Sequence, residues 1–169
     1  VNVTGVNSNS LSFGACVINV DDCYLNGNHA GADGGAISNQ GKVTVDNANM
    51  EGSSFGACVL NVNRSTLTGN NAGADGGAIW NDATGNIHFN RIVFNTAHLG
   101  NAIYSDNAVD ATDNWWGSNY NPKNYPNNFG GQMNLINANP WLTLTIKANP
   151  TSIPYGDTST VTASVTINS

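Results

Sequence analysis

Two aspartates offer the clearest prospect of chemistry in the sequence. Asp33 and Asp75 recur in identical Ala-Asp-Gly-Gly segments, and on coils of about 21 residues they would stand two coils, or roughly 9–10 Å, apart. That separation lies at the upper end of the roughly 6.5–9.5 Å that inverting glycosidases use. Two identical surroundings, however, give no reason for one acid and one base, and Asp in such a corner caps backbone N–H groups. The pattern favours turn capping over calcium binding or catalysis, so we predict no catalytic residue, no metal and no cofactor.

The three cysteines do not form a disulfide framework, because their number is odd and low. Cys16 and Cys58 alternate with Ile37 and Ile79 at 21-residue spacing, which predicts one inner column of buried side chains. Two coils then separate the cysteines, too far for a disulfide, whose Cα atoms lie within about 7 Å. Cys23 is also expected to point inward. The histidines share no metal-ligand spacing and are expected on surface turns or strand faces: His29, His88 and His98.

Aromatic residues provide two further candidate sites. Trp115 and Trp116 stand where the repetitive part of the sequence stops, and the end of a solenoid needs a cap over its core. We therefore expect a packing cap there, with a sugar-stacking platform as the alternative. Three other aromatic side chains are expected to be exposed and are candidate glycan contacts: Trp80, Tyr104 and Trp141.

Composition excludes several classes of function. Charged residues make up only 9% of the chain, the formal net charge is −6, and the five basic residues are scattered. Nucleic-acid binding depends on clustered Lys and Arg, so no nucleic-acid partner is expected. No stretch approaches the roughly 20 apolar residues of a membrane span. The chain starts on Val1 without a visible signal peptide, which suggests a processed or excised segment.

An internal repeat defines the elements that must position these residues. Residues 1–42 align with residues 43–84 without gaps, and 23 of the 42 positions are identical. Within that unit Ala-Cys and Ala-Ile pairs recur every 21 residues, among short stretches of alternating apolar and polar residues. Such a period predicts an all-β fold, a right-handed parallel β-helix (β-solenoid) of about 5–6 coils, with a β-sandwich as the alternative. Asn28, Asn70 and Asn119 share a register and could form a side-chain ladder.

The repeat also predicts the domain boundaries. We expect a parallel β-helix over residues 1–117 and a capping or linker segment over 118–141. Residues 142–169 look like the first two strands of an immunoglobulin-like sandwich, which is incomplete because such a domain needs about seven strands. Two strands alone are not stable, so they either lie on their own β-helix or are completed by another subunit through strand addition. The predicted assembly residues are Val1, Val3, Leu144, Ile146, Val161, Ala163, Val165 and Ile167.

The order of these motifs resembles the adhesin-like surface proteins of methanogenic archaea. The segment Asn114–Asn119 and the Gly156–Val161 segment are similar to the parts that follow the β-helix and open the Ig-like module in that family. The Gly-Gly-Ala-Ile motifs, with Leu-x-x-Asn at residues 25–28 and 67–70, also look like repeats of polymorphic outer-membrane proteins. The chain departs from the archaeal family in its small size, which leaves surface anchoring open.

Together these features predict a non-catalytic structural or adhesive protein. The resemblance implies an extracellular location at the cell surface, with copies of itself or other surface proteins and glycans as partners. The strands after residue 142 suggest head-to-tail polymerisation into a filament by C-terminal strand addition. The alternatives are a glycan-binding module and a polysaccharide-degrading β-helix enzyme, since right-handed β-helices also host such enzymes.

Overall fold

The chain folds almost entirely into short β-strands. The structure is a computed structural model that describes residues 2–4, 12–13, 17–39, 44–46, 54–55 and 59–168. Across these residues there is no α-helix, and the only helical turns are the 3-10 segments η1 (Pro122–Asn124) and η2 (Met133–Leu135). This agrees with the all-β prediction and with a composition rich in Asn, Gly, Ser and Thr, which favour turns over helices.

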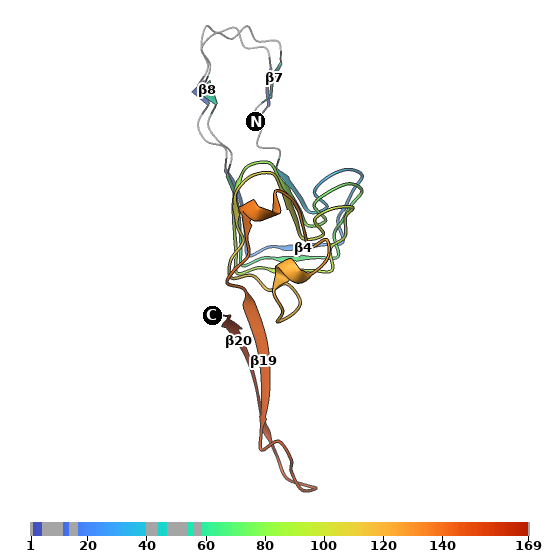
Figure 1. Ribbon diagram of the computed structural model, residues 1–169, viewed down its shortest axis with the longest axis vertical. Helices are drawn as coiled ribbons and strands as arrows, with labels where there is room; N and C mark the ends of the chain where they lie inside the picture. The colour runs from blue at the N-terminus through green and yellow to red at the C-terminus, as the bar shows by residue number, and fades with distance from the viewer. Residues whose placement is uncertain are drawn as a thin grey trace.

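Three sheets of parallel strands make up the body of the molecule, and we call them together the stack (Figure 1). The first sheet has the order β18-β16-β13-β9-β3, with bounds Ile136–Asn137, Val109–Asp110, Thr84–His88, Val59–Asn63 and Val17–Asp21. The second has the order β17-β15-β12-β6, with bounds Phe129–Gly131, Ile103–Ser105, Ile79–Asn81 and Ile37–Asn39. The third has the order β14-β10-β4, with bounds Arg91–Val93, Thr66–Thr68 and Tyr24–Asn26.

Smaller pairs accompany these sheets. The strand β5 pairs in parallel with β11, and both lie between the third and second sheets along the chain. Two further parallel pairs, β1 with β7 and β2 with β8, join residues of the first repeat to those of the second. The bounds of these strands are His29–Ala30, Asn71–Ala72, Asn2–Thr4, Thr44–Asp46, Ser12–Phe13 and Ser54–Phe55.

The strand register shows how the chain returns to each sheet. Val17 pairs with Val59 and Ile37 pairs with Ile79, so one full repeat of 42 residues separates neighbouring strands there. Later returns are shorter, because Ile79 pairs with Ile103. The predicted coil of about 21 residues is therefore wrong for the turns that join Val17 to Val59 and Ile37 to Ile79. The 21-residue spacing arises because the Ala-Cys pairs precede strands of the first sheet and the Ala-Ile pairs begin strands of the second.

The core lies between the sheets and is built from one side of each strand. In β9 and β12 alternate residues are buried, as expected for strands with one face toward a core. The largest fully buried side chains form columns across successive turns: Leu60, Leu67, Ile79, Ile87, Ile92, Ile103 and Ile136. Packing these branched side chains between stacked turns is the main source of stability.

Glycine shapes the corner that leads into the second sheet. Gly34 and Gly76 occupy equivalent positions and have φ values of +68° and +70°, which residues with a Cβ rarely adopt. A Cβ on the next residue, Gly77, would collide with the backbone carbonyl oxygens of Asn101 and Thr96. The Gly-Gly pair of the repeat is thus required both by backbone conformation and by close approach between turns.

Asparagine ladders line another corner of the stack. The side-chain oxygen of Asn70 accepts hydrogen bonds from the backbone N–H (3.1 Å) and side-chain N–H (2.9 Å) of Asn28. Asn95 accepts the same two bonds from Asn70, at 3.0 and 2.9 Å. The predicted ladder is confirmed for Asn28 and Asn70, but its third member is Asn95. Asn119, which was predicted in that place, binds elsewhere.

Parallel pairing continues past residue 117. The strands β17 and β18 add to β15 and β16, and they lie within the segment predicted as a cap or linker. After them the chain forms an antiparallel hairpin of β19 (Leu142–Asn149) and β20 (Thr160–Ile167). In Figure 1 this hairpin, orange to red, projects away from the stack. The three predicted domain boundaries remain predictions.

Candidate functional site

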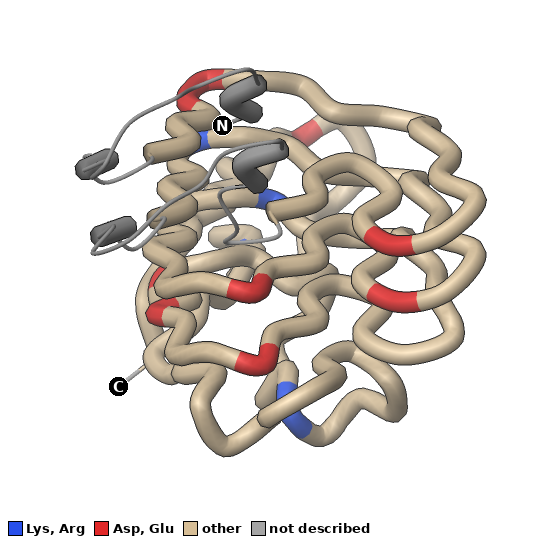
Figure 2. The backbone as a smooth tube through the Cα atoms, turned by 90° about the horizontal axis from the view of Figure 1, so that it is seen from above, with Lys and Arg blue, Asp and Glu red and all other residues tan. Residues whose placement is uncertain are grey.

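Hydrogen bonds between turns link the two repeated corners that carry Asp33 and Asp75. Asp33 accepts a bond of 3.2 Å from the backbone N–H of Asp75, and the backbone oxygen of Asp75 accepts from Gly34 at 2.9 Å. They therefore lie on neighbouring turns, and the predicted separation of two coils is wrong. Figure 2 shows acidic residues recurring at the same place in successive turns, with few basic residues beside them. Asp33 thus accepts from a backbone N–H of the neighbouring turn, and capping within its own corner stays a prediction.

The three histidines and Cys23 lie apart from one another in the described part of the chain. No group of three or more His, Cys, Asp or Glu within the described ranges could hold a metal ion. His98 lies 3.9 Å from the Asp75 carboxylate, and His88 lies 3.9 Å from Asp110. Cys23 is exposed on the first described turn of the stack, whereas Ser65, at the equivalent position of the next turn, is buried, so the inward orientation of Cys23 stays a prediction. Cys16 and Cys58 lie outside the described residues.

An aromatic pair stands on the outward face of the second sheet. Trp80 and Tyr104 are direct partners in neighbouring strands, and their rings stack with centroids 6.5 Å apart and planes within 5°. Gly130 follows Tyr104 in the register, and a Cβ there would lie 2.8 Å from the Tyr104 ring. The glycine thus leaves room for the Tyr104 ring, and the two rings form one flat surface along the stack.

The electrostatic influence of nearby carboxylates reaches the hydroxyl of Tyr104. Burial raises the pKa of Tyr104, and the negative charges of Asp106, Asp75 and Asp33 raise it further, with Asp106 also hydrogen-bonded to it. The flat aromatic surface therefore has hydrogen-bond acceptors beside it. Rings that stack on the apolar face of a sugar, next to groups that bind its hydroxyls, are suited to carbohydrate recognition.

Trp141, the third predicted glycan contact, lies elsewhere. Its indole N–H donates to the backbone oxygen of Asn119 at 3.1 Å, and its side chain packs against the core. The described aromatic contacts join Trp80 to Tyr104 and do not include Trp141. The structure therefore brings together two of the three predicted residues.

The adjacent tryptophans differ in their surroundings. Trp116 is buried and packs edge-on against Phe129, with ring centroids 5.1 Å apart. Trp115 is half-buried and continues the third sheet through a bridge to Arg91. Their role as a cap stays a prediction, because β17 and β18 follow them.

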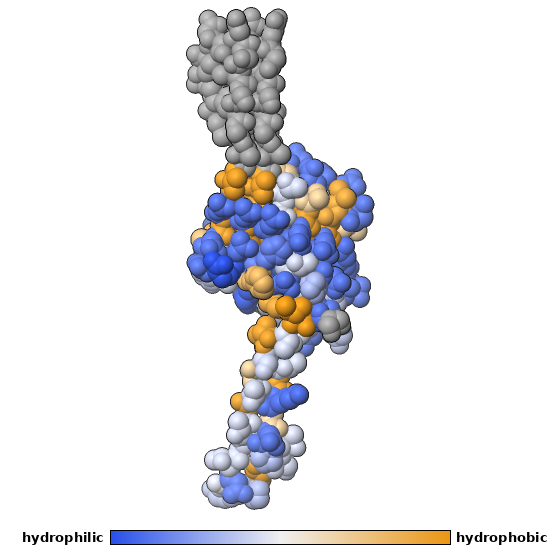
Figure 3. All heavy atoms as spheres, turned by 90° about the vertical axis from the view of Figure 1, so that its left-hand side faces the viewer, coloured by the Kyte–Doolittle hydropathy of each residue, from blue (hydrophilic) through white to orange (hydrophobic). Residues whose placement is uncertain are grey.

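The C-terminal hairpin carries most of the predicted assembly residues. Its register places Leu144 opposite Val165 and Ile146 opposite Ala163, so these side chains share one face of the ribbon. The other face is polar, with Thr143 opposite Thr166. Val161 and Ile167 also lie on the apolar face, where Ile146 is 74% exposed and Val165 61% exposed. Figure 3 shows hydrophobic surface on the hairpin and where it meets the stack.

The N-terminal assembly residues are only partly described. Val1 lies outside the described residues, and Val3 lies in β1, opposite Val45 of β7. The hairpin, by contrast, is fixed at its base. Asn119 accepts a hydrogen bond from the Leu144 N–H (2.7 Å) and donates to the Leu144 oxygen (2.8 Å), as a neighbouring strand would. The sequence analysis does not predict this contact. The one signal for it is the spacing of Asn70, Asn95 and Asn119, which follow one another by about one short turn each.

Comparison with known proteins gives one match. A family model described as the Chlamydia polymorphic membrane protein (Chlamydia_PMP) repeat matches residues 22–40 and 64–82. These two segments are the same part of neighbouring turns, from β4 to β6 and from β10 to β12. No curated protein and no solved structure matches the chain. Over the part of the chain that the structure describes, no helix is both long and apolar enough to span a membrane.

Proposed function

We propose that this chain is a non-catalytic structural or adhesive protein of the extracellular cell surface. Its repeated turns form a right-handed parallel β-helix, a rigid support that displays the hairpin and the outer aromatic pair. The parallel register of successive turns and the match to a repeat of surface-type membrane proteins support this proposal. A relationship to adhesin-like proteins of methanogenic archaea is part of the same proposal and rests on the resemblance alone.

The apolar face of the hairpin carries the argument for assembly. A two-stranded ribbon is marginal in water unless its apolar face is covered. Ile146, Val161 and Val165 are each at least 60% exposed, and each contributes roughly 1–2 kcal/mol if fully buried. An exposed apolar surface of this kind is typical of a protein interaction site.

A second copy of the chain is the proposed occupant of this face. In the described sheets β20 pairs only with β19, and β1 pairs only with β7. Each of these strands therefore presents a row of backbone groups to which another strand can add. We propose that β20 of one copy adds to the N-terminal edge at β1 of the next, which would build a head-to-tail filament.

Sedimentation velocity tests this assembly. We expect the purified chain to show larger species as its concentration rises, and the double variant Ile146→Thr/Val165→Thr to remain monomeric. Threonine keeps the strand preference while removing apolar surface. The matched control Thr145→Ser/Thr162→Ser alters the polar face of the same strands and should assemble like the unmodified chain. A chain that stays monomeric at every concentration contradicts the proposal.

Glycan binding is the second candidate function, because Trp80 and Tyr104 form a flat stacked pair with carboxylates beside it. On a glycan array we expect Trp80→Ala to lose the bound signals of the unmodified chain. Tyr24→Ala, which removes an exposed aromatic ring from the third sheet, should retain them. Equal binding by both variants would exclude the outer pair as the binding surface.

A further inference from the structure

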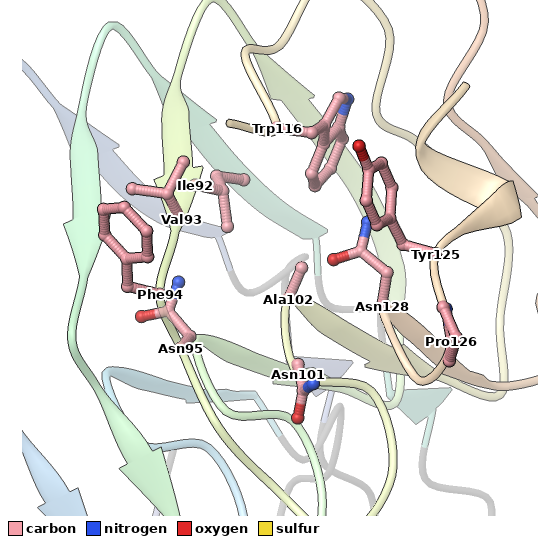
Figure 4. A pocket seen from close by; sticks show the side chains of 10 residues that line it. All are labelled: Ile92, Val93, Phe94, Asn95, Asn101, Ala102, Trp116, Tyr125, Pro126 and Asn128. Atoms are coloured by element: carbon pink, nitrogen blue, oxygen red, sulfur yellow. The ribbon is translucent and has the colours of Figure 1, made fainter. Parts of the chain in front are cut away.

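A cavity of about 190 Å³ opens where the asparagine ladder ends. Asn95, the last rung of the ladder, lines it together with Phe94, Trp116, Tyr125 and Asn128 (Figure 4). The cavity opens to the surface, so a single sugar ring could enter it from outside.

The hydrogen-bond pattern of the ladder indicates which chemical group this cavity would bind. Each earlier rung directs two donors, its backbone N–H and a side-chain N–H, at the carboxamide oxygen of the next rung. The side chain of Asn95 donates to the Leu67 oxygen at 3.0 Å, as Asn70 does to Leu25. Among the described contacts, the backbone N–H of Asn95 and its second side-chain N–H meet no acceptor.

The residue that would supply the next acceptor is turned away. Carrying the register of the Arg91–Trp115 bridge along both segments places Asn119 opposite Asn95. The side-chain oxygen of Asn119 accepts instead from Leu144, at the base of the hairpin. Asn95 is only 6% exposed, and buried donors without an acceptor are costly. The cavity thus begins where an amide oxygen is missing from the pattern.

Aromatic rings and an amide complete the walls. In Figure 4 the rings of Trp116 and Tyr125 lie on one side, Phe94 lies on the other, and the carboxamide oxygen of Asn128 points between them. Phe94 is 79% exposed, and its φ of +59° is the conformation that Gly27 and Gly69 adopt at the same corner of the preceding turns. These walls combine faces for stacking with an acceptor for a hydroxyl.

We propose that this cavity binds an N-acetylated amino sugar. The carbonyl oxygen of the acetamido group takes the place of the missing rung and accepts from the Asn95 backbone and side-chain N–H groups. The sugar ring lies against Tyr125 and Trp116, and a ring hydroxyl donates to the Asn128 oxygen. The site is separate from the outer Trp80–Tyr104 pair and does not depend on it.

Titration of the ¹⁵N-labelled full chain by NMR tests the proposal. N-acetylglucosamine should shift the backbone and side-chain amide signals of Asn95 in a saturable way. Glucose, which lacks the acetamido group, and acetamide, which lacks the ring, should each bind at least tenfold more weakly. Equal binding of glucose overturns the role of the acetamido group, and equal binding of acetamide overturns the role of the ring. No shift at Asn95 with N-acetylglucosamine overturns the whole proposal.

Variants separate binding from folding. Tyr125→Leu keeps an apolar side chain but removes the stacking face, and it should weaken N-acetylglucosamine binding at least fivefold. Tyr120→Ala removes an exposed ring that does not line the cavity, and it should bind like the unmodified chain. Thermal unfolding confirms that both variants are folded. Unchanged affinity in folded Tyr125→Leu contradicts the proposed site.

Discussion

Individual asparagines hold successive turns together, and their contribution depends on burial. Asn70 is fully buried and exchanges hydrogen bonds with Asn28 and Asn95 on the neighbouring turns. We expect Asn70→Ala to lower the free energy of unfolding by at least about 2 kcal/mol, because it leaves buried partners unsatisfied. Asn61 forms a similar ladder with Asn19 and Asn86 on the outer face, so Asn61→Ala should cost less than about 1 kcal/mol. Urea unfolding measures both, and equal losses would refute a role for burial.

The close approach of Gly77 to the next turn leads to a second prediction about stability. Gly77→Ala would drive a Cβ into backbone oxygens of the next turn, so we expect a loss of about 1–3 kcal/mol or more. Gly31→Ala is the matched control, because no atom lies within 4 Å of the added Cβ and its φ is not in the left-handed region. Thermal unfolding of the two variants should differ clearly. A stable Gly77→Ala protein would mean that the turns are not packed this tightly.

The titration of the Tyr104 phenol should make the stability of the folded chain depend on pH. Its pKa is raised in the folded chain by burial and by nearby carboxylates, so the folded state holds the proton more firmly than the unfolded state. That stabilisation is complete below the unfolded pKa and is lost as pH rises through the folded pKa, above about pH 10. Tyr104→Phe should flatten the fall in stability over this range, measured by urea unfolding at several pH values.

Among the elements, the hairpin is bound at its base by one side chain, which pairs with the backbone of β19 as a neighbouring strand would. Asn119 makes two hydrogen bonds to the backbone of Leu144 and accepts none from the ladder. We expect Asn119→Ala to speed hydrogen exchange at the Leu144 amide at least tenfold while the stack remains folded. Asn134→Ala, at an exposed position in η2, should leave exchange unchanged. Unaltered exchange in Asn119→Ala would show that the hairpin is held by other contacts.

The strands also show how far the sequence could predict the fold. Alternation and the 42-residue identity correctly predicted short parallel strands, because each turn pairs with an almost identical copy of itself. The turn length was misjudged because two different corners carry similar Ala-Cys and Ala-Ile pairs. The sequence pattern predicts a column in which Ile37 and Ile79 alternate with cysteines. The strand register instead pairs Ile37 directly with Ile79.

At the candidate sites, residue types could be predicted from the sequence more reliably than contacts. Trp80 and Tyr104 are predicted only as exposed aromatic residues, and their stacking follows from the strand register that the structure adds. Trp141 could not be separated from them, since nothing in its spacing shows that its indole N–H binds Asn119. The cavity at Asn95 was also beyond sequence reasoning, because the spacing does not show that Asn119, one short turn after Asn95, binds Leu144 and leaves the ladder.

The whole molecule joins a repetitive stack to a hairpin with an exposed apolar face. The stack is regular and mostly polar outside, whereas the hairpin exposes branched apolar side chains on one face. Such a division suits a protein whose stack gives length and whose hairpin makes the contacts. Association through the hairpin is therefore the central claim about function.

Negative-stain electron microscopy of the full chain tests that claim most directly. We predict head-to-tail filaments that disappear in the double variant Ile146→Thr/Val165→Thr and persist in Thr145→Ser/Thr162→Ser. Single separate particles of the unmodified chain, at concentrations where the protein is folded, would contradict it.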